Sequence, residues 1–383
     1  MVIALAIGAT PAIAAPAVTK EVEKSPRAIE ASWTTADFLN ARPAEPRRSP
    51  GAAFDLPRFP EAKVSADPGD FYPQNVDQLP QSLHGKVFFR MGGIAYECSG
   101  TLVESKNANS IFTAGHCVYD PATKQWATDF VFVPGYENGA EPHGRYAATL
   151  LASTKGWKES SSFSHDIATA TLAGTPAADL GGAEKVAFDL AANGRSYTIY
   201  GYPGMPNPPY DGERLVGCRA SVVTRDKGSP RPIGAYPCNM THGASGGGWM
   251  TGGYLNAVFS YVYCDDSPDL CGYAFASYFS GAAKRLYTDD GVGGAIPPTV
   301  EFKYSPPRLV KKRKVLFKFG GEASTPLSYL CKFDQRPFEP CRSRTPISRL
   351  SPGTHSLKVR SVDQTGQKSA RTITRKFRVS LKR

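Results

Sequence analysis

The chain has 383 residues, including 37 glycines and 32 prolines, and 41% of its residues are hydrophobic. This composition excludes a disordered or low-complexity protein, and the length suffices for two domains with additional processing segments. The net charge of +11 is uneven, because residues 296–383 hold 21 Lys and Arg against 5 Asp and Glu, a net of +16, whereas residues 1–295 hold 24 against 29, a net of −5.

The positive charge therefore belongs to one C-terminal region. A solvated basic surface is the simplest interpretation, and attachment to an anionic extracellular or cell-envelope surface is the functional one. No nucleic-acid-binding motif accompanies the charge, so specific nucleic-acid recognition is not expected.

Residues 1–15 have the pattern of a secretory signal peptide. A short apolar run leads to Ala12-Ile13-Ala14-Ala15, which resembles an A-x-A cleavage site. The basic residues that usually begin such a signal are absent, and an apolar strand or helix is the alternative. The run is too short to span a membrane, and no other segment is predicted to do so. These features predict a secreted, extracellular protein without a transmembrane segment.

Residues 16–83 are predicted to be a largely irregular pro-segment. They are rich in proline and charge, and the three prolines within residues 42–50 oppose a regular element. The alternative is an extension that stays attached and wraps the surface.

Residues 84–290 have the pattern of an all-β domain. Short apolar runs at 86–90, 129–133 and 196–200 are separated by turns rich in Gly and Pro. A short helix is expected only over residues 282–287.

A Gly- and Pro-rich linker is predicted over residues 291–298, and a second β domain follows over 299–383. Short alternating runs predict strands in a small β-sandwich, at residues 314–318, 327–331, 356–360 and 376–379.

Eight cysteines, an even number, favour disulfides and an oxidising compartment. Neither Cys-x-x-Cys pairs nor clustered histidines argue for a metal site, and no cofactor is expected. Connectivity cannot be proved from sequence, but the simplest pairing is sequential: Cys98–Cys117, Cys218–Cys238, Cys264–Cys271 and Cys331–Cys341. The first bridge would brace the loop that carries His116 and stabilise the fold by roughly 3 kcal/mol.

Three segments together suggest nucleophilic catalysis. Ser245 lies among glycines in residues 241–249, His116 lies among small residues in 113–117, and Asp166 precedes an apolar pair. A serine hydroxyl needs a base to become a good nucleophile, and the base needs a group that orients it. The order His, Asp, Ser is that of the chymotrypsin type.

Thr113-Ala114-Gly115-His116-Cys117 and Gly243-Ala244-Ser245-Gly246-Gly247 resemble the histidine and serine motifs of trypsin-like serine peptidases, and Asp166-Ile167-Ala168 is similar to their aspartate motif. The resemblance implies a chymotrypsin-like double β-barrel of six strands each, with His116 as base, Asp166 as its orienting acid and Ser245 as nucleophile. It also implies an oxyanion hole formed by the backbone N–H groups of Gly243 and Ser245.

Residues 238–249 and Gly201-Tyr202-Pro203 resemble secreted bacterial members, including relatives of the glutamyl endopeptidases. Two departures from animal trypsins are visible: Ala244 replaces the aspartate used in their activation, and neutral Asn239 stands six residues before the serine. Thr241 and His242 are of the types that receive a substrate carboxylate in glutamyl endopeptidases. The resemblance also offers a substrate-binding edge strand at Phe259-Ser260-Tyr261. The preferred residue at the scissile bond stays open.

The C-terminal region resembles a bacterial immunoglobulin-like domain. Cys331 and Cys341 flank an Asp and Phe pattern, and Leu-x-x-Gly-x-His with a following Val-x-x-x-Asp ends near Asp363. His355 of this motif is expected to be a hairpin residue without a catalytic role.

The sequence therefore predicts a secreted serine endopeptidase that acts on proteins or peptides through an acyl-enzyme and is monomeric. One alternative is a serine esterase, because residues 243–247 also satisfy G-x-S-x-G. That arrangement needs its acid and histidine downstream, and only His355 follows Ser245. The other alternative is an inactive protease-fold binding protein.

Overall fold

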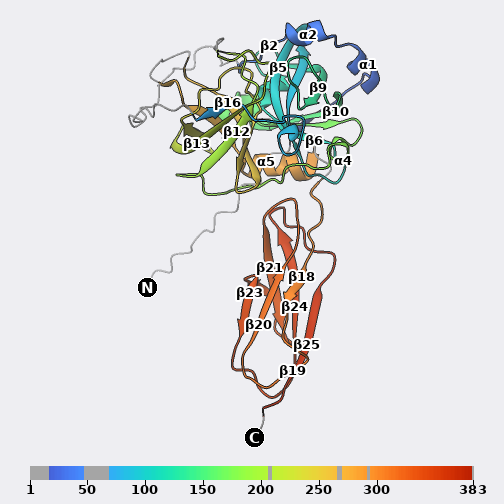
Figure 1. Cartoon of the computed structure of the whole chain (residues 1–383), viewed down its shortest axis with the longest axis vertical. Coiled ribbons are helices and arrows are strands. Elements are labelled where there is room, and N and C mark those ends of the chain that lie inside the picture. Colours follow the sequence, from blue (N-terminus) through green and yellow to red (C-terminus); the bar gives the residue numbers. More distant parts are fainter. Residues whose placement is uncertain (1–16, 47–68, 206–208, 265–269, 291–293, 382–383) are drawn as a thin grey trace, which may run out of the picture.

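The computed structural model describes residues 17–46, 69–205, 209–264, 270–290 and 294–381. Strands dominate, and the all-β prediction is confirmed (Figure 1). A large upper part contains two barrels, and a slender lower part formed by the C-terminal strands hangs from it. No helix within these described ranges is long and apolar enough to cross a membrane.

The first sheet closes into a six-stranded barrel because β9 pairs with both β4 and β10. Its strands are β4 (His84–Met91), β5 (Ile94–Val103), β6 (Ser110–Thr113), β9 (Thr128–Pro134), β10 (Tyr146–Ser153) and β11 (Ala168–Leu172). The predicted strands at 86–90 and 129–133 lie in β4 and β9. Phe89, Phe130 and Phe132 are among the buried residues that fill the interior.

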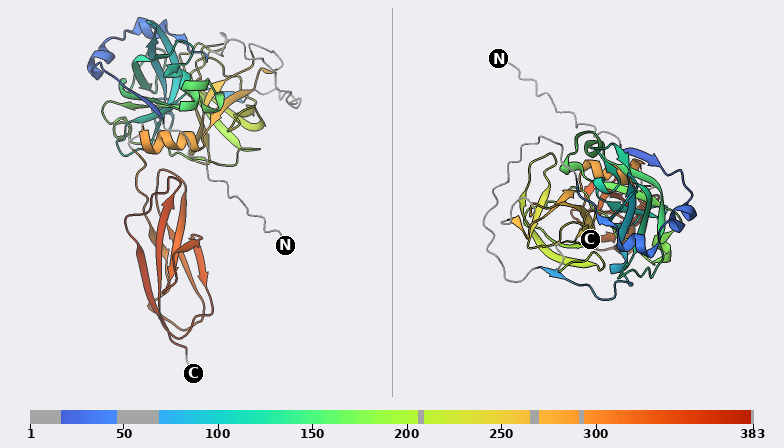
Figure 2. Two further views of the ribbon diagram at one scale, coloured as in Figure 1. Left: turned by 180° about the vertical axis from the view of Figure 1, so that it is seen from behind. Right: turned by 90° about the horizontal axis from the view of Figure 1, so that it is seen from above.

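The second barrel closes because β12 pairs with both β13 and β15. Its strands are β12 (Ser196–Gly201), β13 (Val216–Arg225), β14 (Ile233–Tyr236), β15 (Gly248–Thr251), β16 (Tyr254–Tyr261) and β17 (Ala274–Tyr278). The predicted strand at 196–200 lies in β12. A short strand from earlier in the chain, β3 (Asp70–Phe71), adds to the edge of β13. The double barrel expected from the resemblance is thus confirmed, and Figure 2 shows the two barrels side by side from above.

A separate apolar cluster joins the barrels. Phe112 of β6 packs on Phe279 with ring centroids 4.5 Å apart, and Val186 and Tyr287 belong to the same cluster. The predicted helix at 282–287 is present as α5 (Gly281–Arg285), which continues into the short π-helix η5 (Leu286–Asp290). Burial of this shared cluster fixes the two barrels against each other, and the cleft between them with it.

Short elements lie between the barrel strands and carry much of the site. They are η1 (Gln81–Leu83), η2 (Gly115–Cys117), β7 (Tyr119–Asp120), β8 (Gln125–Trp126), α3 (Lys155–Ser160), η3 (Phe163–His165) and α4 (Pro176–Asp179).

The prediction that residues 16–83 are largely irregular is wrong for residues 17–46. This leading segment forms β1 (Val18–Glu21), α1 (Pro26–Ala31), α2 (Thr35–Leu39) and β2 (Arg42–Pro43). β1 pairs antiparallel with β10, and β2 pairs with β5 despite the prolines expected to oppose a regular element. Pro43 is tolerated because β2 is a two-residue edge strand.

Apolar side chains hold the leading segment on the first barrel. Ile29, Trp33 and Phe38 are buried, and Phe38 stacks on Phe88 with centroids 4.0 Å apart. Thr34 caps α2 in a capping box. These few apolar anchors, spaced among prolines and charges, outweigh the irregular composition. Residues 47–68 of the predicted pro-segment lie outside the described ranges.

The C-terminal strands form two small sheets around a core that includes Phe317, Val359 and Phe377. One sheet contains β18 (Glu301–Tyr304), β20 (Val315–Gly320) and β23 (Arg344–Ile347). The other contains β19 (Leu309–Val310), β25 (Ile373–Val379), β24 (Gly353–Asp363), β21 (Leu327–Phe333) and β22 (Glu339–Cys341). The four predicted strands correspond to β20, β21, β24 and β25. In the predicted linker, residues 294–298 form no regular element, and residues 291–293 lie outside the described ranges.

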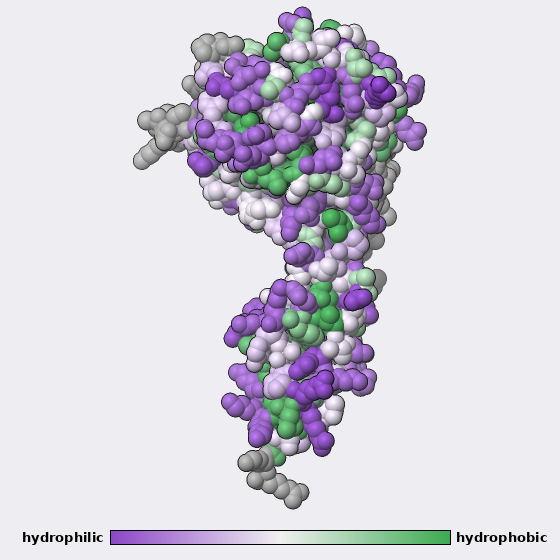
Figure 3. All heavy atoms as spheres, turned by 45° about the vertical axis from the view of Figure 1, so that its right-hand side comes forward, coloured by the Kyte–Doolittle hydropathy of each residue, from purple (hydrophilic) through white to green (hydrophobic). Residues whose placement is uncertain are grey.

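This C-terminal unit touches the barrels through a few backbone contacts. The side-chain amide of Gln364 forms two hydrogen bonds with the backbone of Phe188. The Phe188 N–H donates to Gln364 Oε1 at 2.8 Å, and Gln364 Nε2 donates to the Phe188 carbonyl at 3.1 Å. Nearby, the Val186 N–H donates to the Ser324 carbonyl at 2.9 Å. On the face drawn in Figure 3, the surface of the C-terminal unit is mostly hydrophilic, with small hydrophobic patches.

Candidate active site

Pairing of β6 with β11 brings His116 and Asp166 together. Ala168 lies opposite Thr113 in this antiparallel pair, so the turn η2 after β6 and the turn η3 before β11 meet at one end of the barrel. His116 is on η2, and Asp166 directly follows η3. Register alone therefore places these two side chains side by side, although 50 residues separate them in the sequence.

Asp166 is fully buried, and three groups bind its carboxylate. Oδ1 accepts the backbone N–H of His116 at 2.8 Å, and Oδ2 lies 2.8 Å from His116 Nδ1. Ser260 donates its hydroxyl to the same Oδ2 at 2.5 Å. Because an ionised carboxylate only accepts hydrogen bonds, Nδ1 must carry the ring proton. The other ring nitrogen, Nε2, is buried without a hydrogen-bond partner among the described residues.

Gly115 is required for this close approach. A Cβ atom at this position would lie 2.7 Å from the Trp157 ring and 2.8 Å from Asp166 Oδ1. Trp157 is itself fully buried and donates its indole N–H to the Tyr119 carbonyl at 2.9 Å. The small residue before His116 thus leaves space for the acid and for the rigid indole that packs beside it.

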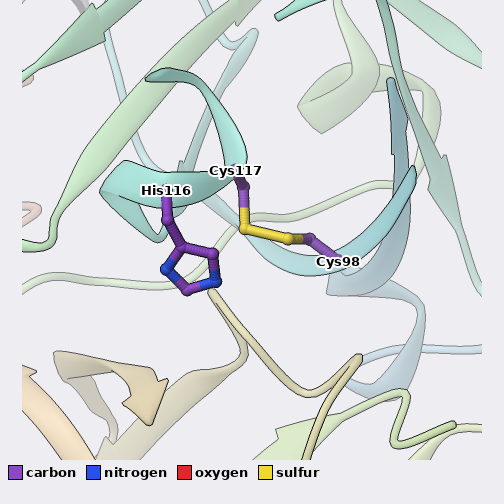
Figure 4. A group of neighbouring side chains, drawn as sticks. All are labelled: Cys98, His116 and Cys117. Atoms are coloured by element: carbon purple, nitrogen blue, oxygen red, sulfur yellow. A yellow bond between two sulfur atoms is a disulfide. The ribbon is translucent and has the colours of Figure 1, made fainter. Parts of the chain in front are cut away.

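The Cys98–Cys117 disulfide braces the His116 turn, and Figure 4 shows the imidazole beside it. The structure joins the other cysteines in the predicted pairs as well, Cys218–Cys238, Cys264–Cys271 and Cys331–Cys341. Cys98, His116 and Cys117 are close enough together to suggest a metal site. The disulfide consumes both thiols, however, and a metal site needs thiolates, so these residues do not fit a metal.

The loop before β15 holds Ser245 against the first barrel. The Ser99 N–H of β5 donates to the Ser245 carbonyl at 2.7 Å, and the Gly246 N–H donates to the Phe259 carbonyl at 2.8 Å. Gly246 has φ +81°, and a Cβ there would lie 2.2 Å from Thr113 Oγ1. This position therefore requires glycine, both for its backbone conformation and for its close contact with β6.

Ser245 is almost fully buried. The Cys117 sulfur is 3.9 Å from the Ser245 carbonyl oxygen, so the two loops are in contact. Among the described residues no hydrogen bond joins the Ser245 hydroxyl to His116. Such bonds are often long in the absence of substrate and shorten when it binds.

Two backbone N–H groups of the serine loop take no part in the hydrogen bonds within that loop. The amides of Ala244 and Gly247 donate to Thr241 and Ala244 within the loop. The amides of Gly243 and Ser245 take part in no hydrogen bond within the described part of the chain. Gly243 has φ +90°, a conformation that favours glycine. Both N–H groups are thus left available for an anionic oxygen.

A buried ion-pair cluster lies next to the serine loop. Lys86 is fully buried, and its Nζ lies 2.6 Å from the Glu97 carboxylate and 3.1 Å from that of Glu213. Burial raises the pKa of the Glu97 carboxyl, and the charge of Lys86 opposes this shift. Glu97 Oε1 would lie 3.4 Å from a Cβ on Gly243. Ser99 adds to the support by donating its hydroxyl to the Gly243 carbonyl at 2.9 Å.

The predicted pocket residues have different environments. Thr241 lines a cavity beside the serine loop, but its hydroxyl donates to the Met205 carbonyl. His242 does not line that cavity, and its Nδ1 is 3.8 Å from the Glu45 carboxylate of the leading segment. Ser260 binds Asp166, as described above.

The other two residues of the predicted edge strand, Phe259 and Tyr261, are buried within the second barrel. The Phe259 N–H donates to the Gly247 carbonyl at 2.8 Å, which connects the strand to the serine loop. The Tyr261 hydroxyl donates to the Asp226 carboxylate at 2.5 Å, and burial with this charge raises the pKa of Tyr261. Their side chains therefore pack and position neighbouring segments.

The sequence reasoning missed Lys86, Glu97 and Ser99. No local pattern distinguishes them, because each acts through a contact between β4 or β5 and the distant serine loop.

No family model matches the chain. An extracellular metalloprotease of Bacillus subtilis is 38% identical over 86 residues, which are 22% of this chain and 26% of that protein. The chain thus matches about a quarter of the length of this curated relative.

Among solved structures, a thermostable serine protease AL20 from an extremophilic microorganism is 36% identical, with 54% of this chain and 95% of that one covered at a TM-score of 0.49. Protease Anisep from Arthrobacter nicotinovorans is also 36% identical, with 54% and 94% covered and a TM-score of 0.48. A Glu endopeptidase is 19% identical, with 58% and 96% covered and a TM-score of 0.48. The identity to AL20 and Anisep over nearly their whole length, together with the two closed six-stranded barrels of this chain, shows that it belongs to the bacterial serine proteases of the chymotrypsin fold.

Proposed function

We propose that the protein is a secreted serine endopeptidase that hydrolyses peptide bonds through His116, Asp166 and Ser245. The observation that carries this proposal is the buried Asp166 carboxylate, which binds both the backbone N–H and the ring of His116 and leaves Nε2 unpartnered. An imidazole held in this tautomer presents a lone pair, and a basic nitrogen beside a serine loop is suited to deprotonate a hydroxyl.

In the proposed mechanism His116 Nε2 takes the proton of the Ser245 hydroxyl as its oxygen attacks the substrate carbonyl. The N–H groups of Gly243 and Ser245 stabilise the resulting oxyanion. His116 then returns the proton to the leaving amine, and the acyl group stays on Ser245. A water molecule, deprotonated by the same nitrogen, releases the acid and restores the serine. Asp166 stabilises the charged imidazolium throughout.

The esterase alternative is disfavoured by the element that follows the serine. The G-x-S-x-G elbow of esterases leads into a helix, whereas Ser245 leads into β15 (Gly248–Thr251), a strand of the second barrel. The inactive-binder alternative makes a different prediction, since it requires that Ser245 does not react.

The experiment treats the purified full chain with a fluorophosphonate probe and then with a peptide library. Labelling that is lost in Ser245→Ala and His116→Ala supports the proposal, and turnover should fall on the order of 10⁶-fold in either variant, without further loss in the double variant. Ser196→Ala is the matched control, because its hydroxyl pairs with Ser221 on the outer face of the second barrel. Labelling unaffected by Ser245→Ala would refute the assignment.

The leading segment is proposed to act as a pro-segment that limits access to the cleft. Pro43 and Glu45 line, together with His116 and Trp157, a cavity of about 410 Å³. The Ala44 N–H donates to the Glu97 carbonyl at 3.0 Å, which fixes the segment at the rim. Equal activity of the full chain and of a form lacking residues 17–46 would count against this role.

The proposal also includes secretion and the organisation of the chain into domains. Four disulfides favour an oxidising compartment, while the predicted signal at 1–15 lies outside the described residues. The peptidase domain is proposed to begin near residue 69 rather than at the predicted residue 84, because β3 pairs with β13 of the second barrel. Residues 299–383 are proposed to be an immunoglobulin-like domain that binds an anionic extracellular or envelope surface.

A further inference from the structure

A second cavity of about 410 Å³ lies beside the serine loop, on the side of the second barrel. One wall is formed by Asn239–Thr241, directly before that loop, and Val262 of the other wall is two residues after Ser260. The Ala244 N–H donates to the Thr241 carbonyl at 3.1 Å, so the first wall is hydrogen-bonded to the residue next to Ser245. The cavity therefore borders the segment that leads to the proposed nucleophile.

The lining of this cavity is mainly apolar, with aromatic rings such as those of Phe71, Tyr210 and Tyr273. Asp70 is the one charged residue among the described residues that line it. A carboxylate among apolar groups loses much of its hydration, which makes a cation that reaches it a favourable partner.

Neutral donors hold the Asp70 carboxylate in place. The Asn239 N–H lies 3.2 Å from Oδ1 and 3.3 Å from Oδ2, and the Tyr210 hydroxyl donates to Oδ2. Burial, with the hydrogen bond to Asp70 and its charge, raises the pKa of Tyr210, so this phenol stays protonated as a donor. These contacts orient the carboxylate without neutralising it.

Within the described ranges, no cationic side chain neutralises Asp70 either. Arg214 and Arg219 are close in the fold, but their guanidinium groups stack on the rings of Tyr72 and Phe71, at 4.2 and 4.3 Å from the centroids. No Lys or Arg in the described ranges forms an ion pair with Asp70. The charge is thus available to a ligand.

Strand pairing explains how Asp70 reaches this site. In the pair of β3 with β13, Asp70 lies opposite Cys218, which is bonded to Cys238, the neighbour of Asn239. A Cβ on Gly69 would lie 2.4 Å from the Arg219 carbonyl, so the glycine allows the strand to approach closely. The β3–β13 pair therefore places Asp70, which is far from Ser245 in sequence, beside the neutral Asn239.

We infer that this cavity receives the side chain that precedes the scissile bond, and that Asp70 selects lysine and arginine there. The inference rests on the proposed endopeptidase function. Lysine and arginine carry long apolar stems that suit the walls and a cationic end that suits the carboxylate. An acidic side chain would be repelled, and an apolar one would cover the Asp70 carboxylate without supplying a cation.

The same geometry disfavours a preference for glutamate. Thr241 already donates its hydroxyl to the Met205 carbonyl, and His242 does not line the cavity. Neither residue is therefore placed to receive a substrate carboxylate in this cavity.

The test compares kcat/KM of the full chain and of the form lacking residues 17–46 on matched fluorogenic peptides with Arg, Lys, Leu or Glu before the scissile bond. Arg and Lys should exceed Leu and Glu by on the order of 10²-fold or more, because a mismatched side chain covers the Asp70 charge without supplying a cation. Asp70→Asn should remove most of this difference, by lowering kcat/KM on the Arg and Lys peptides and raising it on the Leu peptide. An unchanged Arg-to-Leu ratio in Asp70→Asn, or a wild-type preference for Glu or Leu, would overturn the inference.

Asp77→Asn is the matched control, since Asp77 is an exposed acid of the same segment outside the cavity, and it should keep the wild-type ratio. A second measurement does not need catalysis: benzamidine, as the cation probe, should bind Ser245→Ala and bind at least 10-fold more weakly when Asp70→Asn is added. Thermal unfolding of Asp70→Asn verifies that it folds. Failure of fluorophosphonate labelling would reject the endopeptidase proposal, whereas labelling without a basic preference would reject this inference alone.

Discussion

The ammonium of Lys86 lies 2.6 Å from the carboxylate of Glu97, and the lysine side chain is completely inaccessible to solvent. This ion pair joins β4 to β5, and Glu97 lies close to the serine loop, since its Oε1 would be 3.4 Å from a Cβ on Gly243.

Lys86→Met is expected to destabilise the protein by about 3–5 kcal/mol, because it leaves the buried carboxylate of Glu97 and the partly buried one of Glu213 without their cation. Urea unfolding followed by tryptophan fluorescence measures the change. Lys24→Met is the control: Lys24 pairs with Asp129 at 2.7 Å, but its side chain is 59% exposed, so its loss should cost no more than about 1 kcal/mol. Equal effects of the two substitutions would contradict the importance of the buried pair.

Ser260→Ala is expected to lower kcat/KM about 10-fold with little change in KM. The substitution removes one of three hydrogen bonds to Asp166 and so loosens the group that orients His116. Steady-state kinetics on the best peptide of the library provide the measurement. Ser361→Ala, which removes a buried hydroxyl that donates to the Thr299 carbonyl in the C-terminal unit, should leave both constants unchanged. A similar loss in both variants would point to a general effect on folding.

Glu184→Gln is expected to change how stability depends on pH. Burial, with a contribution from Glu104, raises the pKa of Glu184 to about 7 from 4.5. The folded state therefore keeps a proton that the unfolded state loses, and this stabilisation is complete below pH 4.5 and lost as the pH rises through 7. The loss is about 3 kcal/mol, and the variant should lack it.

His84 must be considered in the same experiment, because its Nε2 is 3.8 Å from Glu184. Burial lowers the pKa of His84 to about 3, so its contribution rises with pH between about 3 and 6.5, opposite to that of Glu184. Denaturant unfolding of wild type and Glu184→Gln at several pH values from 4 to 8 separates the two, since His84 is present in both proteins and only Glu184 differs. A difference in unfolding free energy between wild type and variant that stays constant from pH 4.5 to 7 would refute the prediction.

Gln364→Ala is expected to loosen the C-terminal unit without affecting peptide cleavage. It removes both hydrogen bonds to the Phe188 backbone, worth about 1–3 kcal/mol together. Small-angle scattering should show a broader distribution of overall dimensions than for Gln335→Ala, the exposed control. Identical scattering of the two variants would mean that other contacts fix the arrangement.

Deletion of residues 299–383 should leave peptide cleavage intact and reduce salt-sensitive retention on an anionic matrix. The reason is that this region carries the positive charge of the chain. Retention at 50 and 500 mM salt, with and without the deletion, provides the measurement. Unchanged retention would leave the proposed surface binding without support.

The two barrels and the approximate positions of their strands could be predicted from sequence, because alternation along a strand and small residues around His116 and Ser245 are local signals. The leading segment could not, since Ile29, Trp33 and Phe38 are too widely spaced to form a periodic pattern. The role of Asp70 could not be predicted from sequence for another reason. Its place beside Asn239 depends on a two-residue strand pair and a disulfide, both of which join parts of the chain far apart in sequence.

The leading segment is held to the first barrel by the β1–β10 hydrogen bonds and by a buried aromatic cluster. A cut anywhere between residues 46 and 69 would therefore sever the chain without separating the two pieces. Release of the cut peptide would be a dissociation equilibrium, governed by dilution and by capture or digestion of the free fragment. Cleavage of the chain and the onset of activity would then be separable in time. Concentrated, freshly cleaved protein would stay inactive until it was diluted.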